Sequence, residues 1–115
     1  MRFVVTGAAG FIGSHLLRTL LERGHQAVGW DAFTDYYDPV LKEENADGLP
    51  VERVDLVESG LDLAGVDGVF HLAGQPGVRS FGDVFRIYVR ENVLATPRVL
   101  EAAVSSGSRV VLASS

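Results

Sequence analysis

The sequence predicts an α/β fold, a doubly wound parallel sheet with helices on both faces. Three observations support this fold: short apolar runs recur along the chain, helical spacing fills the gaps between them, and three glycines separate the first run from the first helical segment. Strands that alternate with helices form βαβ units, and nearly continuous apolar strands suit a sheet that is buried on both sides. The predicted strands cover 2–5, 26–30, 51–56, 68–73 and 109–114.

The first helical segment covers 12–24, where five apolar residues fall on one face and Gly24 is the stop signal. These residues are Ile12, Leu16, Leu17, Leu20 and Leu21. The region 32–50 has no apolar period and is predicted to be an excursion between the second and third strands, with a short helix around 39–44.

A second helical pattern covers 84–106 and ends before Gly107. Pro97 lies inside it, removes one backbone donor and clashes with the preceding turn. We therefore predict a kink, or two helical pieces that meet near Ala95 and Thr96.

Size and composition limit the chain to one domain, 1–115, with one sizeable core: it has 115 residues, of which 47% are hydrophobic. Cysteine is absent, so neither a disulfide framework nor a thiolate metal site is expected, which suits a reducing cytoplasm. The net charge is −5 and the arginines are scattered, which argues against a nucleic-acid partner. With no leader pattern and no apolar segment near about eighteen residues, we expect no membrane association.

The stretch VVTGAAGFIGSHL places glycines at the junction of the first strand and the first helix. Gly7 is predicted to make the tight exit from the strand, Gly10 to lie against a pyrophosphate, and Gly13 to allow close packing of the helix. The helix beyond them directs unpaired N–H groups and its positive dipole end at that phosphate. The pattern thus predicts a dinucleotide-binding turn.

Asp31 ends the second predicted strand, where an acidic side chain accepts hydrogen bonds from the adenine ribose and repels a 2′-phosphate. No arginine or lysine directly follows it, so NAD is favoured over NADP. The alternative is that Asp31 is an ordinary polar residue at a strand end.

These residues resemble the extended short-chain dehydrogenases/reductases, in particular nucleotide-sugar epimerases and dehydratases. The spacing of the three glycines is typical of that family, and the resemblance continues through Asp55-Leu56, HLAG at 71–74, ENVLATPRVLEAA at 91–103 and VVLASS at 110–115. The segments 30–42 and 71–81 look most like UDP-glucuronate 4-epimerases. The fold that the resemblance implies is a Rossmann-type NAD-binding domain, incomplete at the C-terminus because the substrate domain is absent.

The resemblance also implies roles for individual residues. The pyrophosphate turn would comprise Gly7, Gly10, Phe11, Ile12 and Gly13, and Asp31 would hold the ribose. Asp55 and Leu56 would flank the adenine. The path to the nicotinamide would be lined by Leu72, Ala73, Gly74, Asn92, Ala113 and Ser114, and Arg79 would meet a sugar carboxylate. Each has a simpler alternative: Asp55 caps a loop, Asn92 bonds to backbone, Leu72 is core, and Arg79 is a surface residue.

The family's chemistry uses a tyrosine with a lysine four residues later, and a nicotinamide that exchanges hydride with the sugar. The residues four positions after Tyr36, Tyr37 and Tyr88 are valine, leucine and asparagine. We therefore expect no catalytic residue in these 115 residues. The histidines lack metal-ligand spacing and are expected to be structural.

Three functions compete. The first is the NAD-binding portion of a nucleotide-sugar epimerase that forms a homodimer. The second is a non-catalytic NAD-binding or sensing module. The third is a fragment of a nucleotide-sugar 4,6-dehydratase or decarboxylase.

Overall fold

The computed structural model describes residues 1–33, 39–74, 86 and 89–113. Within these ranges, five parallel strands form one sheet in the order β3-β2-β1-β4-β5. The order reverses between β1 and β4, which is the arrangement of a doubly wound sheet, and this confirms the predicted fold class. The strands are β1 (Arg2–Thr6), β2 (Gln26–Asp31), β3 (Val51–Arg53), β4 (Gly68–His71) and β5 (Arg109–Leu112).

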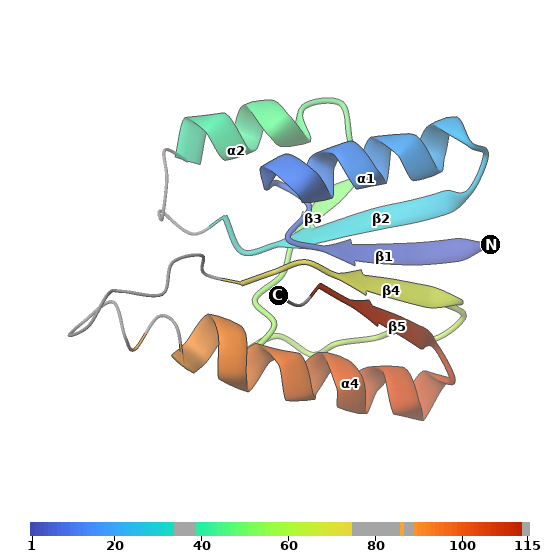
Figure 1. Ribbon diagram of the computed structural model, residues 1–115, viewed down its shortest axis with the longest axis vertical. Coiled ribbons are helices and arrows are strands. Elements are labelled where there is room, and N and C mark those ends of the chain that lie inside the picture. The colour runs from blue at the N-terminus through green and yellow to red at the C-terminus, as the bar shows by residue number, and fades with distance from the viewer. Residues whose placement is uncertain (34–38, 75–85, 87–88, 114–115) are drawn as a thin grey trace.

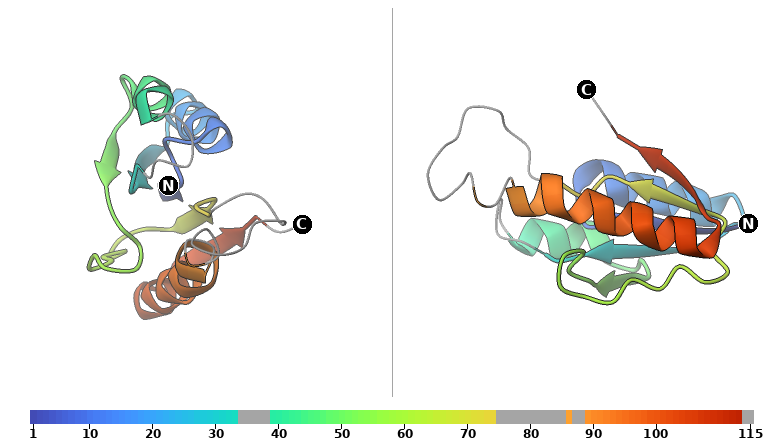
Figure 2. Two further views of the ribbon diagram at one scale, coloured as in Figure 1. Left: turned by 90° about the vertical axis from the view of Figure 1, so that its left-hand side faces the viewer. Right: turned by 90° about the horizontal axis from the view of Figure 1, so that it is seen from below.

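Helices cover the sheet from both sides (Figure 1). Helices α1 (Phe11–Glu22) and α2 (Pro39–Ala46) lie on one side, and α4 (Ala95–Ser106), preceded by the π-helical segment η1 (Val89–Leu94), lies on the other. The end-on view in Figure 2 separates these two layers. No helix within the described ranges is long and apolar enough to cross a membrane.

The core divides into two clusters because successive side chains of β1 point to opposite faces of the sheet. Val4 packs in the cluster under α4 with Val99, and Val5 packs in the cluster under α1 with Leu17. All four side chains are almost fully buried. The carboxyl end of β1 is therefore packed between two helical layers, which fixes the position of the glycine loop that follows it.

Strands β3, β4 and β5 all end earlier than predicted. Strand β3 ends at Arg53 because its partner β2 ends at Asp31, and after one last bond from the Val54 N–H to the Asp31 carbonyl the chain turns away and buries Leu56. Strand β4 ends at His71, since the following N–H groups turn to a side chain of β1.

Strand β5 ends at Leu112, one residue before the last that the structure describes. It is an edge strand, and Val111 is 56% exposed.

The helical predictions are confirmed within the described residues, with one adjustment. Positions 84, 85, 87 and 88, at the start of the second helical pattern, lie outside the described residues. Leu17 and Leu20 are buried, and Gly24, at φ +83°, follows the end of α1 as expected. Ile12 is instead 68% exposed, because it lies in the first turn, beside the glycine loop and beyond the edge of the core. The predicted short helix is present as α2.

Pro97 explains the division of the second helical pattern. The π-helical segment ends at Leu94 and α4 begins at Ala95, as the sequence predicted. Pro97 thereby falls in the first turn of α4, the part of a helix in which proline is tolerated. The Thr96 hydroxyl donates to the Asn92 carbonyl at 3.2 Å and bridges the junction.

Candidate functional site

The loop after β1 contains a glycine that no other residue could replace without a shift in the backbone. Gly7 has φ +71°, and a Cβ atom on it would lie 2.9 Å from the backbone nitrogen of Ala73. The Gly7 and Ala8 N–H groups both donate to the carbonyl of Trp30 on β2. The loop is therefore held between the carboxyl ends of β2 and β4, where doubly wound folds bind ligands.

Helix α1 begins in direct contact with this loop. A Cβ atom on Gly13 would lie 2.1 Å from the Gly7 carbonyl oxygen, so only glycine permits this approach. The helix has neither a side-chain cap nor an acidic residue in its first turn, and Phe11 at its start is 73% exposed. The N–H groups that every helix leaves unpaired at this end, with the positive end of the dipole, thus suit an anion.

Asp31 connects the glycine loop to the end of β2. Its Oδ2 accepts a hydrogen bond from the Ala9 N–H at 3.0 Å, and its Oδ1 accepts one from the Phe33 N–H at 2.7 Å. Phe33 has φ +55°, a left-handed conformation that turns the chain sharply after the strand. A carboxylate oxygen accepts two hydrogen bonds, so each oxygen can accept one more, from a ligand.

Two residues that the sequence analysis did not select lie beside Asp31. Asn45 on α2 donates to the Ala9 carbonyl at 3.1 Å and braces the glycine loop. Arg53 pairs with Asp31 in the β2–β3 register, and its guanidinium lies 4.6 Å from the centre of the Phe33 ring. Both reach the site through tertiary pairing, for which the local sequence carries no signal.

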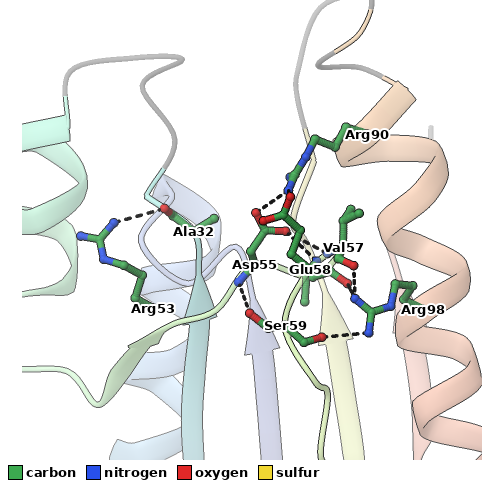
Figure 3. A network of polar contacts seen from close by, with 9 residues as sticks. Ala32, Arg53, Asp55, Val57, Glu58, Ser59, Arg90 and Arg98 are labelled. Atoms are coloured by element: carbon green, nitrogen blue, oxygen red, sulfur yellow. Dashed lines mark hydrogen bonds and ion pairs between the residues drawn. The ribbon is translucent and has the colours of Figure 1, made fainter.

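Asp55 anchors the turn that follows β3 (Figure 3). Its Oδ1 accepts from the N–H groups of Val57 and Glu58 at 2.9 and 3.2 Å, and its Oδ2 lies 2.6 Å from Nη2 of Arg90 on η1. Burial raises the pKa of Asp55, but the hydrogen bonds from Arg90 and the two N–H groups outweigh burial and hold the pKa below its ordinary value. The alternative of a loop cap is thus realised in the structure, and the predicted contact with adenine stays a prediction.

The side chain of Arg98 on α4 binds the backbone carbonyls of the same turn (Figure 3). Its Nη1 donates to the carbonyls of Leu56 and Val57, and its Nη2 donates to the carbonyl of Ser59 at 2.8 Å. Neither arginine is predicted from the sequence. Only the fold brings Arg90 to Asp55 and Arg98 to the carbonyls of the turn that follows β3.

A buried chain of hydrogen bonds links β1, β4 and α4. The Thr6 hydroxyl accepts from the N–H groups of Leu72 and Ala73, at 3.0 and 3.1 Å, so its proton donates to Nδ1 of His71 at 2.7 Å. His71 is consequently protonated on Nε2, which donates to the Thr96 hydroxyl at 3.0 Å. Burial lowers the pKa of His71, in agreement with a neutral ring.

This neutral histidine predicts a loss of stability in acid. An unfolded histidine has a pKa of about 6.5, whereas burial lowers the pKa of folded His71. As the pH falls below about 6.5, the unfolded chain gains a proton that the folded chain does not, so the free energy of unfolding decreases by up to about 1.4 kcal/mol per pH unit.

Urea denaturation between pH 7.5 and 5.5 measures this effect. The same slope in a His71→Gln variant that still folds would contradict the assignment of the pH dependence to His71.

The described residues among those predicted to approach the nicotinamide also lie at the carboxyl end of the sheet. A Cβ atom on Gly74 would lie 2.8 Å from Oδ1 of Asn92, so these two predicted residues are in contact. Ala73 also packs against the core cluster under α4, and Leu72 packs against the cluster under α1. The contact of Leu72 agrees with its simpler alternative, a core residue. The Ala113 N–H donates to the carbonyl of His71 at 3.4 Å, beyond the end of β5.

Two predicted residues, Arg79 and Ser114, lie outside the described residues. Among the residues that the structure does describe, no group of three histidine, cysteine, aspartate or glutamate side chains could hold a metal ion.

Comparison with known proteins extends these observations. The chain is 45% identical over 112 residues to the uncharacterized UDP-glucose epimerase YtcB of Bacillus subtilis (strain 168). The matched region covers 89% of this chain and 35% of the relative. It is 35% identical over 114 residues to the probable UDP-glucuronate 4-epimerase of Rhizobium meliloti (strain 1021). That matched region covers 90% of this chain and 33% of the relative. The chain spans about a third of the length of these relatives.

A solved structure of an epimerase also matches the fold of this chain. The fold matches UDP-glucuronic acid 4-epimerase from Bacillus cereus in complex with NAD, with a TM-score of 0.87 and 34% identity, over 97% of this chain and 39% of that chain. Residues 3–115 match the model of the NAD dependent epimerase/dehydratase family. The glycine loop, the acid at the end of β2 and this match over nearly the whole chain lead to one conclusion: the chain belongs to the NAD-dependent epimerase/dehydratase family.

Proposed function

We propose that this chain is the NAD-binding portion of a nucleotide-sugar epimerase. The observation that carries the proposal is the joint geometry of the glycine loop and Asp31. The uncapped start of α1 suits a diphosphate. The Asp31 carboxylate accepts one N–H group on each oxygen, from Ala9 and Phe33, and supports the proposal because each oxygen can accept a further hydrogen bond, such as one from a ribose hydroxyl. When bound, NAD supplies the hydride acceptor of the reaction, and these residues orient it.

The substrate that we propose is a UDP-hexuronate or UDP-hexose, which the complete protein would epimerise at C4. Support comes from the names of the relatives, which include a UDP-glucose epimerase and UDP-glucuronate 4-epimerases. Arg79 remains our candidate for a sugar carboxylate, because a guanidinium binds a carboxylate bidentately.

Asp31→Arg tests the choice of cofactor. The substitution removes the acceptor for the ribose hydroxyls and supplies a cation for a 2′-phosphate, so NAD affinity should fall at least about tenfold and the preference should move toward NADP. Fluorescence titration with NADH and NADPH measures the ratio.

Glu22→Arg makes the same change of charge at the far end of α1 and should leave the ratio unaltered. An unchanged cofactor preference in Asp31→Arg would remove Asp31 from the ribose site and defeat the proposed geometry.

These 115 residues alone should not turn over UDP-glucuronate in the presence of NAD. No tyrosine in them is followed four positions later by the lysine that lowers the tyrosine pKa in this chemistry. Coupled detection of UDP-galacturonate would measure conversion, and any turnover above that of a boiled sample would contradict this expectation.

The setting that we propose is a homodimer in the cytoplasm. Apolar residues on α4 and at its approach remain exposed, notably Val93 at 59% and Val104 at 83%, and a second copy would cover such a surface. Sedimentation of the wild-type chain and of Val104→Glu would measure the dimer and its loss.

A further inference from the structure

The two oxygens of the Asp55 carboxylate have different partners (Figure 3). Oδ1 accepts two backbone N–H groups, which uses the two acceptor positions of a carboxylate oxygen. Oδ2 accepts from Arg90 at 2.6 Å and has a second acceptor position. The Asp55 and Arg90 side chains are 30% and 32% exposed, so a ligand can reach the pair.

The position of this pair relative to Asp31 follows from the sheet order. Strand β3 lies beside β2, and Asp55 follows β3 just as Asp31 ends β2. If Asp31 holds the ribose, as the proposed function requires, the attached base lies over the carboxyl end of the sheet, with β3 on one side of it. The inference below rests on that proposed function.

The pair presents a hydrogen-bond acceptor and a donor side by side. An oxygen and a nitrogen 2.6 Å apart offer the pattern of the asparagine or glutamine carboxamide, which recognises adenine through its amino group and an adjacent ring nitrogen. Adenine presents the complementary pattern, since its amino group donates and its neighbouring ring nitrogens accept.

We propose that Arg90 is an adenine-recognising residue, whose guanidinium donates to a ring nitrogen of the base while Asp55 accepts from the amino group. Nη2 of Arg90 also lies 3.5 Å from a carboxylate oxygen of Glu58, whose side chain is 77% exposed. An exposed ion pair of this kind contributes little to stability, so a ring nitrogen can replace Glu58 as the partner of Nη2. Arg98 keeps the turn, and with it the carboxylate, in place during this exchange.

The experiment combines residue variants with changes of single ligand atoms. Affinities of the 115-residue chain are measured by calorimetry for NAD and for its two analogues in which N1 or N7 of the adenine is replaced by a C–H group. The proteins are the wild type, Arg90→Met, which keeps the length of the side chain, and Arg98→Met, which releases the turn without removing the donor to the base. Thermal unfolding verifies that each variant folds.

For the wild type we expect one of the two analogues to bind about tenfold more weakly than NAD. In Arg90→Met, NAD affinity should fall by about the same factor and the difference between NAD and that analogue should disappear. Arg98→Met should weaken all three ligands alike and preserve the difference.

Three results would overturn the assignment of Arg90. The wild type binds both analogues as well as NAD; Arg90→Met still discriminates against the same analogue; or Arg90→Met binds NAD more tightly, in which case Arg90 competes with the base for Asp55. A wild-type chain that binds none of the three ligands refutes the proposed function itself, and that outcome is distinct from the other three. The wild-type comparison remains decisive if Arg90→Met does not fold.

Discussion

Gly13→Ala should destabilise the chain by about 3 kcal/mol, the upper part of the range for overpacking in a closely packed interior. The added Cβ atom would lie 2.1 Å from the carbonyl oxygen of Gly7 and 2.8 Å from its carbonyl carbon, both of which are backbone atoms. No rotation of a side chain can relieve that contact, so α1 must move away from the loop. Urea denaturation followed by circular dichroism measures the loss.

Gly60→Ala is the matched control, because nothing lies within 4 Å of a Cβ atom at Gly60 and its φ is not in the left-handed region. Its stability should stay within about 0.5 kcal/mol of the wild type. If Gly13→Ala were as stable as Gly60→Ala, the close approach of α1 to the glycine loop would be wrong, and with it the geometry of the diphosphate site.

Thr6→Val should also cost about 3 kcal/mol, although valine and threonine have nearly the same shape. The substitution removes the acceptor of the Ala73 N–H and the donor to Nδ1 of His71, and both groups belong to a buried network. Buried polar groups without a partner are costly because water cannot replace the lost bond. The free energy of unfolding in urea, measured at pH 7.5, reports the loss.

Thr19→Val separates this effect from the general cost of a valine. The Thr19 hydroxyl donates to the carbonyl of His15 on the exposed side of α1, where water can take its place. Thr19→Val should lower the free energy of unfolding by only about 0.5 kcal/mol. Equal effects of the two substitutions would show that the Thr6–His71–Thr96 chain does not stabilise the fold.

The fold could be predicted from the sequence because its signals are local. Apolar runs and helical spacing are properties of neighbouring residues, and Gly24 and Pro97 mark helix boundaries through their own backbone chemistry. Strand ends were harder to predict. Strand β3 ends where its partner ends and β4 ends where Thr6 takes over its N–H groups, and neither cause is visible in the strand itself.

The difference between local signals and tertiary contacts also explains which site residues could be predicted. Gly7 and Asp31 were found from the order of strand, glycine, helix and acid, which is a local pattern with a physical reason. Asn45, Arg53 and Arg90 could not be found in this way. Each reaches the site from an element that is distant in sequence, and a polar residue on a helix or an edge strand is usually just exposed to water.

An anionic diphosphate is proposed to bind at the loop that joins β1 to α1. Calorimetric titration of the folded chain with NAD tests it most directly, with Gly10→Val as the comparison. Gly10 has φ −77° and ψ 173°, an extended conformation that valine also adopts, so the substitution requires no left-handed backbone. We predict saturable binding of one NAD per chain, weaker binding of NADP, and loss of both in Gly10→Val. If the folded wild-type chain gives no heat with either dinucleotide at several temperatures, or if Gly10→Val binds NAD as tightly as the wild type, the claim is contradicted.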